Sequence, residues 1–328
     1  MSFLAFMFSV TSFFGCSKTV TEINVKDFGA IPNDGKDDTP AIIKAVEECA
    51  SKTRSKLIFE FGTYDIYGSQ KDERSNFFPS VVIKNVTNLT IEGNGSEFVG
   101  HDYASMFHFS NCSNLSIANL TVDWDPLPYT QGKVTQVDSD YLDIEVIAPF
   151  IAKKGLHTEA IIGYDPEKRR MARRFTDHYQ LGFEKTTEVV GPGIMRLFIG
   201  RKDRFSGTMP VVGTYVIARH QVYGYQSFEL EKCKNVHLEN INIYSNPGMG
   251  VTGDECRDIS IRHLKVMLRP GTGRWMSCTA DATHFAGCRG TITMENCLFE
   301  GMGDDATNVR SGHYLLVSER LGNNILRI

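Results

Sequence analysis

Three aspartates in the C-terminal third of the chain have the residue type and spacing for acid–base chemistry. The segment Asp-Ala-Thr-His-Phe that begins at Asp281 recurs as Asp-Ala-Thr-Asn-Val at Asp305, 24 residues later, and Asp304 adds a third acid. If one repeat is one coil of a stacked structure, Asp281 and Asp305 lie on neighbouring strands about 4.8 Å apart. Carboxylates that close repel each other, so the pKa of one of them rises. A protonated carboxyl beside an ionised one is what acid–base cleavage of a glycosidic bond requires.

A simpler explanation for the paired acids is that they only close a turn. Gly303 precedes them and permits a sharp bend of the backbone. A turn alone, however, needs no copy of its aspartate one repeat earlier. The echo of Asp281 in Asp305 therefore favours an active site, provided that successive repeats stack.

Internal repeats supply that stacking. Each repeat has a small buried residue, a turn Asn or Asp, an alternating apolar strand, an Asn or His corner and a second strand. The copies are residues 85–93, 111–122, 232–243, 255–266 and, with one extra residue, 288–299. Alternate residues of a strand face the same side, so the apolar positions of each copy face inward. A unit of about two dozen residues cannot bury that face alone, so the units must stack.

The predicted fold is therefore all-β: a right-handed parallel β-helix with an N-terminal capping helix and a small inserted β domain. Helical periodicity is nearly confined to residues 39–50, where Asp38 or Thr39 followed by Pro40 is typical of a helix start. Such a helix would close the open end of the solenoid.

The repeat pattern also predicts the domain organisation. We expect a leader over residues 1–21, the first coils over 22–123, an inserted β domain over 124–226, and further coils with the three aspartates over 227–328. The last coil stops without a polar cap, so we expect the solenoid to be truncated.

Charge and cysteine content exclude several classes of function. The net charge is −4, from 35 basic and 39 acidic residues, which gives no footprint for nucleic acid. Four of the eight cysteines occupy the same place in a repeat, which predicts a ladder of buried free thiols and not disulfides: Cys112, Cys233, Cys256 and Cys288. No Cys or His spacing is typical of a metal site, so we expect no metal.

The first fifteen residues are apolar, too short a run to span a membrane, and placed where an export signal belongs. Gly15-Cys16 at the end of this run resembles the cleavage box of bacterial lipoproteins, in which the cysteine is lipidated. We therefore expect an exported bacterial lipoprotein, periplasmic or anchored to the outer membrane through Cys16. A plain secreted protein or a misplaced start codon is the alternative.

Two sets of segments resemble known families. Residues 25–39 resemble the N-terminal motif of pectate-lyase-like β-helix proteins, which include hydrolases, lyases and phage tailspikes. Residues 121–132, 280–284 and 301–309 resemble the bacterial α-1,3-galactosidase family that removes blood-group B galactose, glycoside hydrolase family 110. The second resemblance covers residues 22–328, and because members are longer, this chain is expected to be an N-terminal portion.

The family resemblance implies an activity and a division of labour. It implies an inverting exo-hydrolase, without a cofactor, that cuts terminal α-1,3-linked galactose from glycans. Carried over to this sequence, Asp304 matches the proton donor, and Asp281 and Asp305 match the pair that activates water. Inversion requires the acid and the base to lie about 6.5–9.5 Å apart, with water between them.

Three further residues near Asp281 are candidate substrate-binding groups. Trp275 is predicted to stack on the apolar face of galactose and Arg274 to bind hydroxyl groups, while His284 is predicted to contact substrate or tune the carboxylates. A packing role for Trp275 and a purely structural role for His284 are equally consistent with the sequence.

Other functions stay open at this point. A polygalacturonase-like hydrolase also uses clustered aspartates, but its acidic substrate needs Lys and Arg, which are few around Asp281 and Asp304. A lyase would need calcium-binding carboxylates and a basic catalytic residue, and no such set stands out. A non-catalytic carbohydrate-binding β-helix would have no use for the aspartate column. The sequence leaves a homo-oligomer open, and does not separate branched from linear galactosyl substrates.

Overall fold

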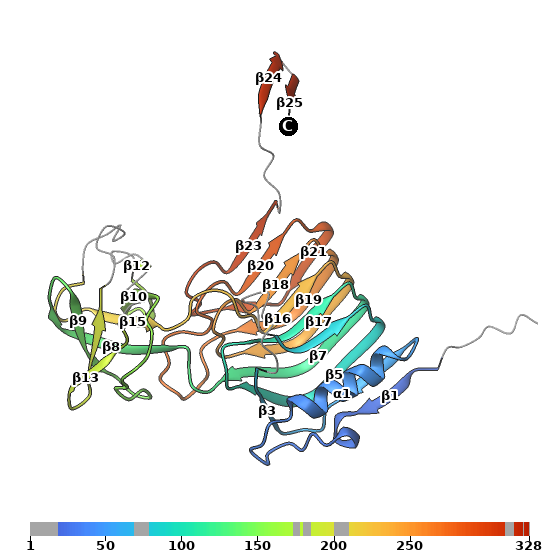
Figure 1. Cartoon of the computed structure of the whole chain (residues 1–328), viewed down its shortest axis with the longest axis horizontal. Coiled ribbons are helices and arrows are strands. Elements are labelled where there is room, and N and C mark those ends of the chain that lie inside the picture. The colour runs from blue at the N-terminus through green and yellow to red at the C-terminus, as the bar shows by residue number, and fades with distance from the viewer. Residues whose placement is uncertain are drawn as a thin grey trace, which may run out of the picture.

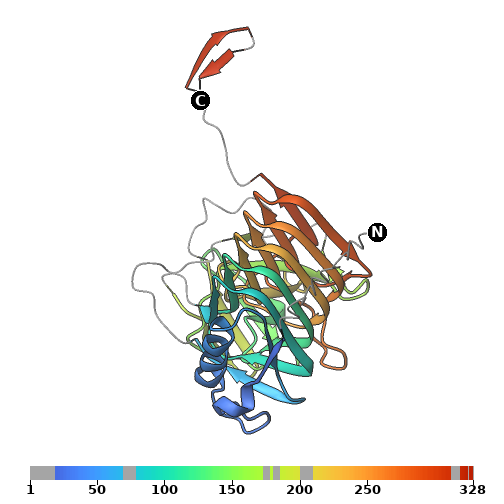
Figure 2. The same cartoon turned by 90° about the vertical axis from the view of Figure 1, so that its right-hand side faces the viewer.

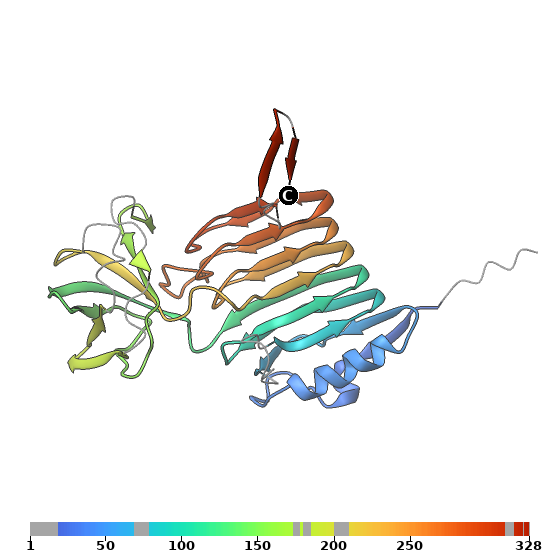
Figure 3. The same cartoon turned by 45° about the horizontal axis from the view of Figure 1, so that its top comes forward.

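The computed structural model describes residues 19–68, 79–172, 178–179, 185–199, 210–311, 318–323 and 325–327. Its main body is a stack of coils in which strands of successive coils pair in parallel (Figures 1 and 3). Turned by 90°, the coils form one continuous column (Figure 2). The predicted parallel β-helix is therefore confirmed.

One side of each coil contributes to a parallel sheet that has nine strands among the described residues. Its main order is β1-β2-β5-β7-β17-β19-β21, while β3 pairs with β5 and β22 pairs with β19. The bounds are β1 Thr21–Asn24, β2 Ser55–Ile58, β3 Thr63–Ile66, β5 Thr87–Gly100, β7 Ser113–Trp124, β17 Lys234–Ile243, β19 Arg257–Val266, β21 Arg289–Glu295 and β22 Leu298–Phe299.

A second parallel sheet lies on the other side of the coils, and the aspartates lie just before two of its strands, β20 and β23. Within the described part of the chain it has six strands in the order β23-β20-β18-β16-β6-β4. The bounds are β4 Pro79–Lys84, β6 Ser105–Ser110, β16 Phe228–Glu231, β18 Val251–Asp254, β20 Thr283–Ala286 and β23 Thr307–Arg310. Apolar side chains of both sheets point inward and form one continuous core.

Helix α1 (Thr39–Ala50) follows a short 3₁₀ helix, η1 (Val25–Phe28), and packs under the first coil (Figure 1). Ile42 and Val46 of α1 belong to the same core as the strands. Asp38 precedes the helix as predicted, but its side chain makes no capping hydrogen bond. It accepts hydrogen bonds from the backbone N–H groups of Ile31 (2.9 Å) and Asp65 (3.1 Å), so it joins the helix start to the first coil.

An antiparallel sheet interrupts the solenoid between β7 and β16 and lies beside the stack (Figure 1). Its strand order is β11-β10-β15-β8-β9-β14-β13, with β12 paired to β10, which makes eight strands in the described residues. The bounds are β8 Tyr129–Val137, β9 Tyr141–Val146, β10 Ala160–Asp165, β11 Arg170–Met171, β12 His178–Tyr179, β13 Glu188–Gly191, β14 Ile194–Phe198 and β15 Tyr215–Arg219. A hairpin of β24 (Glu319–Gly322) and β25 (Ile325–Arg327) ends the described chain.

The predicted thiol ladder is present in the core. The thiols of Cys112, Cys233 and Cys256 are free and buried, and that of Cys288 is free and half-buried. Sulfur lies against backbone groups of the neighbouring coil, as where the Cys233 N–H donates to Cys256 Sγ at 3.3 Å. The thiols therefore fill the space between coils as small apolar groups.

Most of the predicted leader, including Cys16, falls in residues 1–18, which lie outside the described residues. Among the residues that are described, no helix has the length and apolar character needed to cross a membrane.

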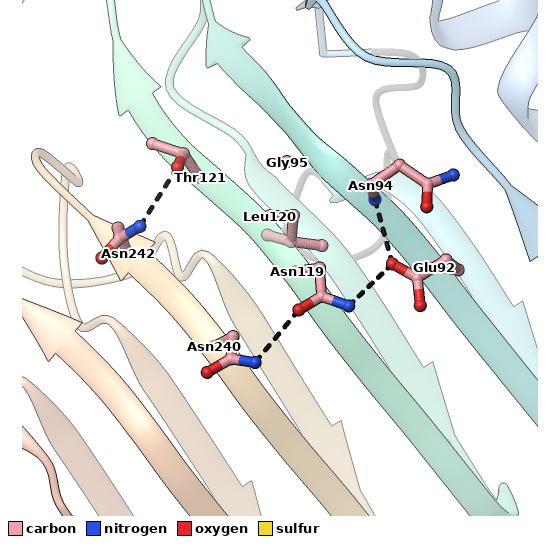
Figure 4. A pocket seen from close by; sticks show the side chains of 8 residues that line it. All are labelled: Glu92, Asn94, Gly95, Asn119, Leu120, Thr121, Asn240 and Asn242. Atoms are coloured by element: carbon pink, nitrogen blue, oxygen red, sulfur yellow. Dashed lines mark hydrogen bonds between the residues drawn. The ribbon is translucent and has the colours of Figure 1, made fainter.

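Asparagine side chains form ladders where the coils turn. Asn88, Asn114 and Asn235 all have positive φ, and their amides are linked: Asn114 donates to Asn88 (2.8 Å) and Asn235 donates to Asn114 (2.9 Å). A parallel ladder lines an open polar pocket, where Asn240 donates to Asn119 and Asn119 donates to Glu92 (Figure 4). Asn suits these sites because its short polar side chain tolerates the left-handed conformation.

Replacement of Asn114 tests this double role. Asn114→Ala removes both hydrogen bonds of the side-chain amide and places an ordinary side chain at φ 54°. We therefore expect it to lower the free energy of unfolding by about 1–2 kcal/mol. Asn114→Gly removes the same bonds but tolerates positive φ, so its loss should be smaller. Urea denaturation measures both values. Equal losses in the two variants would show that the backbone conformation contributes nothing.

Candidate active site

The three aspartates lie where two adjacent strands of the second sheet begin. Asp281 precedes β20, Asp304 and Asp305 precede β23, and the two strands pair with Thr283 opposite Thr307. The backbone ladder extends back to the acids, since the Ala282 N–H donates to the Asp305 carbonyl at 2.9 Å. Asp281 and Asp305 therefore occupy equivalent positions on neighbouring coils.

The structure brings the three carboxylates together. One oxygen of each lies within 4.8 Å of the others in the group Asp281, Asp304 and Asp305. Asp281 is only 3% exposed, whereas Asp304 and Asp305 are exposed to solvent. Three close carboxylate oxygens would also suit a hard cation, so the expectation of a metal-free site stays a prediction.

The electrostatics of the group centre on Asp281. Burial raises the pKa of this carboxyl, and the negative charge of Asp304 raises it further. Hydrogen bonds from His284 and from the Asp305 N–H oppose the shift and lower the pKa. The net direction is upward, so Asp281 holds a proton to higher pH than an ordinary aspartate.

His284 hydrogen-bonds Asp281, and the contact has a defined polarity. Its Nδ1 lies 2.7 Å from Asp281 Oδ2, while Arg310 Nε donates to its Nε2 at 3.0 Å. Because a guanidinium can only donate, Nε2 is the acceptor and Nδ1 carries the hydrogen. Neutral His284 therefore donates to Asp281, which fits the predicted tuning role.

The second copy of the repeat has the same local hydrogen bond. Asn308 Nδ2 donates to Asp305 Oδ2 at 3.0 Å, as His284 does to Asp281, each from three residues further on. Sequence reasoning missed Asn308 and Arg310. The repeat itself held the signal for Asn308, since Asp-Ala-Thr-His and Asp-Ala-Thr-Asn both place a donor three residues after the acid.

Asp304 is approached from the inserted domain. The Tyr223 hydroxyl, from the segment that follows β15, donates to Asp304 Oδ2 at 2.5 Å. No local sequence pattern indicates this contact, because Tyr223 and Asp304 belong to different units of the fold. Tyr223 is 40% exposed, so its ring borders the open side of the group.

Close packing fixes the backbone beneath Asp304. A Cβ atom on Gly303 would lie 2.4 Å from the Thr279 carbonyl oxygen, so a side chain here would displace the loop. The fully buried Arg219, at the end of β15, donates from Nη1 to the same carbonyl at 2.8 Å. The inserted domain therefore supports the loop of Asp304 as well as its side chain.

Comparison with known proteins places this geometry in context. An α-1,3-galactosidase A of Shewanella woodyi is 29% identical over 98% of this chain and 56% of its own length. An α-1,3-galactosidase B of Bacteroides thetaiotaomicron is 29% identical over 88% of this chain and 50% of its own length. The chain is similar to bacterial α-1,3-galactosidases.

The similarity to these galactosidases has a defined extent. The chain spans about half the length of the curated relatives it matches. No family model matches it. Among solved structures, the family 28 exopolygalacturonase of Yersinia enterocolitica has a TM-score of 0.43 and 14% identity over 89% of this chain and 45% of its own length.

Arg274 is engaged in an ion pair in the structure. Its Nη1 lies 2.8 Å from Asp123 Oδ1 and 2.9 Å from Oδ2, and Arg269 binds the same carboxylate. Asp123 is 2% exposed, so it requires these cations to compensate its burial. Arg274 also lines an open cleft of about 640 Å³ whose lining does not include the three aspartates. The predicted contact of Arg274 with galactose hydroxyls therefore finds no support in its position.

Trp275 has the packing role that the sequence left as the alternative to sugar stacking. Its ring stacks on Tyr164 of the inserted domain, with ring centres 4.5 Å apart and planes 3° from parallel, and meets Tyr215 edge-on at 5.8 Å. Tyr164 covers one face of the ring, and stacking of Trp275 on galactose stays a prediction. Trp275 attaches the loop before Asp281 to the inserted domain.

Proposed function

We propose that the protein is a glycoside hydrolase that removes terminal α-1,3-linked galactose from glycans. The observation that carries this proposal is the convergence of Asp281, Asp304 and Asp305 at one sheet edge. The chain around them is similar along nearly its whole length to α-1,3-galactosidases. The terminal galactosyl group would lie over the three carboxylates.

In this proposal Asp304 donates the proton and Asp281 and Asp305 activate water. Asp281 and Asp305 share one column, and the Asp305 N–H donates to Asp281 Oδ1 at 3.4 Å, so both can face one water molecule. Asp304 is exposed and accepts a hydrogen bond from the Tyr223 hydroxyl. An exposed acid next to the pair is positioned to reach the glycosidic oxygen.

Electrostatics offers a second assignment of the proton. The carboxyl whose pKa is raised in the free protein is Asp281, and a raised pKa is what a general acid needs. In a cluster of interacting carboxyls, however, the proton belongs to the group and not to one residue. If Asp304 is the acid, Asp304→Asn removes only the protonation of the leaving group. If Asp281 is the acid, Asp281→Asn has that effect instead.

The spacing of the carboxylates bears on the stereochemistry. One oxygen of each carboxyl lies within 4.8 Å of the others, whereas inverting enzymes hold their two carboxyl groups about 6.5–9.5 Å apart with water between them. Inversion is therefore proposed on the strength of the family resemblance, with Asp304 turning outward once substrate and water are bound. The anomer that is released first distinguishes inversion from retention.

The product of hydrolysis provides the main test. With a blood-group B trisaccharide, we expect early proton NMR spectra to show β-galactose, because water attacks opposite the leaving group. Initial release of α-galactose would contradict inversion. It would show that one of the three aspartates acts as a nucleophile on the sugar. Release of sugar only from polygalacturonate would favour the polygalacturonase-like alternative, and binding without hydrolysis would favour a carbohydrate-binding protein.

Variants of the acids complete this test. Asp304→Asn should lower kcat/KM on the trisaccharide by about 10³-fold. It should affect α-galactosyl fluoride much less, since fluoride departs without a proton. Asp281→Asn and Asp305→Asn should impair both substrates. If Asp281→Asn instead spares only the fluoride, then Asp281 is the acid and the assignment by resemblance is wrong.

The hydrogen bond from His284 predicts a pH effect. It lowers the pKa of Asp281, so His284→Ala should raise that pKa further. A base must be ionised to act, so the acid limb of the kcat/KM profile should move to higher pH, with roughly ten-fold lower activity at its foot. His284→Asn is the matched control, because Asn308 already donates to Asp305 in this geometry. A shift of equal size in both variants would exclude the hydrogen bond as the cause.

We also propose that the protein is exported. The apolar leader within residues 1–21 and the lipoprotein-like Gly15-Cys16 support this, and lipidation of Cys16 would place the site outside the cytoplasm. Labelling of the natural protein with an alkyne fatty acid tests the anchor. Labelling that persists in Cys16→Ser would contradict it.

A further inference from the structure

A column of residues runs along the sheet edge from Asp304 toward the N-terminal coils. Phe228 pairs with Val251, Val251 with Thr283, and Thr283 with Thr307. Three residues before each of these positions, the same register places Tyr225, Gly248, Ala280 and Asp304 in line. Backbone hydrogen bonds continue this register, including Ser227 N–H to Met249 (3.3 Å), Ala280 N–H to Gly248 (3.0 Å) and Gly303 N–H to Cys278 (2.9 Å).

The column sets the distance between Tyr225 and the acid. Tyr225 and Asp304 are three coils apart, which corresponds to about 14 Å along the stack. The position of Tyr225 is fixed by the buried Asn246, whose Nδ2 donates to the Tyr225 carbonyl at 3.0 Å. Gly248 packs against the same carbonyl, where a Cβ atom would lie only 2.1 Å from the oxygen.

An aromatic pair stands at this end of the column. The ring of Tyr225 stacks with that of Tyr103, from the loop before β6, with centres 6.2 Å apart and planes 15° from parallel. Tyr103 is 41% exposed and Tyr225 is half-buried. Two fixed tyrosines at the surface give an apolar platform with polar hydroxyl groups, which suits the C–H face and hydroxyls of a sugar.

The segment that returns from the inserted domain joins this pair to the acid. Thr279 Oγ1 donates to the Val222 carbonyl at 3.2 Å, and the Val222 N–H donates to Glu159 at 2.8 Å, so the segment is held against the solenoid. Its next residue, Tyr223, reaches Asp304, and Tyr225 follows two positions later. Asp304, Tyr223, Tyr225 and Tyr103 therefore form a continuous strip.

We propose that these tyrosines form the subsites for the leaving group: Tyr223 lies beside the sugar to which the terminal galactose is attached, and Tyr225 and Tyr103 bind a sugar further along the glycan. This deepens the proposed function and rests on it. A general acid must lie beside the leaving oxygen, so the next sugar has to lie on the Asp304 side of the trio. The strip begins at Asp304 and runs parallel to the Asp281 and Asp305 column, one residue earlier in each coil and therefore on the side of Asp304.

The charge of the strip narrows the class of sugar. Around the three tyrosines the structure places Glu159, whose pKa is raised by burial, while Arg219 is fully buried beneath the loop. An acidic sugar would require an accessible cation to offset its carboxylate. Among the described residues, the charged side chain that acts on Tyr103 and Tyr225 is Glu159, so this part of the strip fits a neutral hexose or an N-acetylated amino sugar.

The test compares two substrates with the same α-1,3-linked terminal galactose. A linear tetrasaccharide reaches Tyr225 and Tyr103, whereas the α-1,3-galactosyl-galactose disaccharide ends before them. The ratio of their kcat/KM values should fall about ten-fold in Tyr225→Ala and in Tyr103→Ala. Tyr225→Phe keeps the ring and should retain most of the ratio. Because both substrates use the same folded fraction, a partial loss of folding cancels in the ratio.

An exposed aromatic residue elsewhere supplies the control. Phe61, between β2 and β3, is 77% exposed, and Phe61→Ala should leave the ratio unchanged. If the wild type cleaves both substrates and the tyrosine variants leave the ratio unaltered, the subsite is wrong while the galactosidase function stands. If the wild type cleaves neither substrate, the proposed function fails and the subsite with it.

Discussion

Parallel pairing between successive coils is the constraint on which the rest of this structure depends. It fixes the spacing of equivalent residues at about 4.8 Å, whatever their side chains are. Where the equivalent residues are Asn88, Asn114 and Asn235, the spacing lets each side-chain amide form a hydrogen bond with the next one. Where they are Asp281 and Asp305, the same spacing forces two acids together. The backbone holds the acids in a contact that their charges oppose.

The inserted domain converts this crowded edge into an asymmetric site. Arg219 and Tyr223, which lie at its exit, support the loop and the carboxylate of Asp304. His284 and Arg310 belong to the solenoid and act on Asp281. The two sides of the trio thus have different partners, one from each unit. Different surroundings shift the pKa values of neighbouring carboxyls apart, so that one can act as an acid and another as a base.

The features that depend on the repeat could be predicted from the sequence. The 24-residue echo placed Asp281 and Asp305 on adjacent coils, and the repeats gave the β-helix and the inward-facing thiols. Sequence reasoning failed for contacts between units that are distant in sequence. Tyr223 on Asp304 and Trp275 on Tyr164 depend on how the inserted sheet packs against the solenoid, which no local pattern records. Arg274 was assigned to substrate because its loop precedes Asp281, and no local pattern indicates its ion pair with the distant Asp123.

Burial in the stack raises the pKa of Asp281, the neighbouring charge of Asp304 raises it further, and the proposed acid–base chemistry depends on this shift. A ¹³C NMR titration of aspartate-labelled protein measures this directly, with Asp281→Asn used to assign the resonance. Asp281 should titrate above the value of about 3.9 for an unperturbed aspartate. Asp304→Asn should lower the pKa of Asp281, because a neighbouring charge is removed. Titration of Asp281 at or below the ordinary value, unaffected by Asp304→Asn, would show that burial and Asp304 do not raise its pKa.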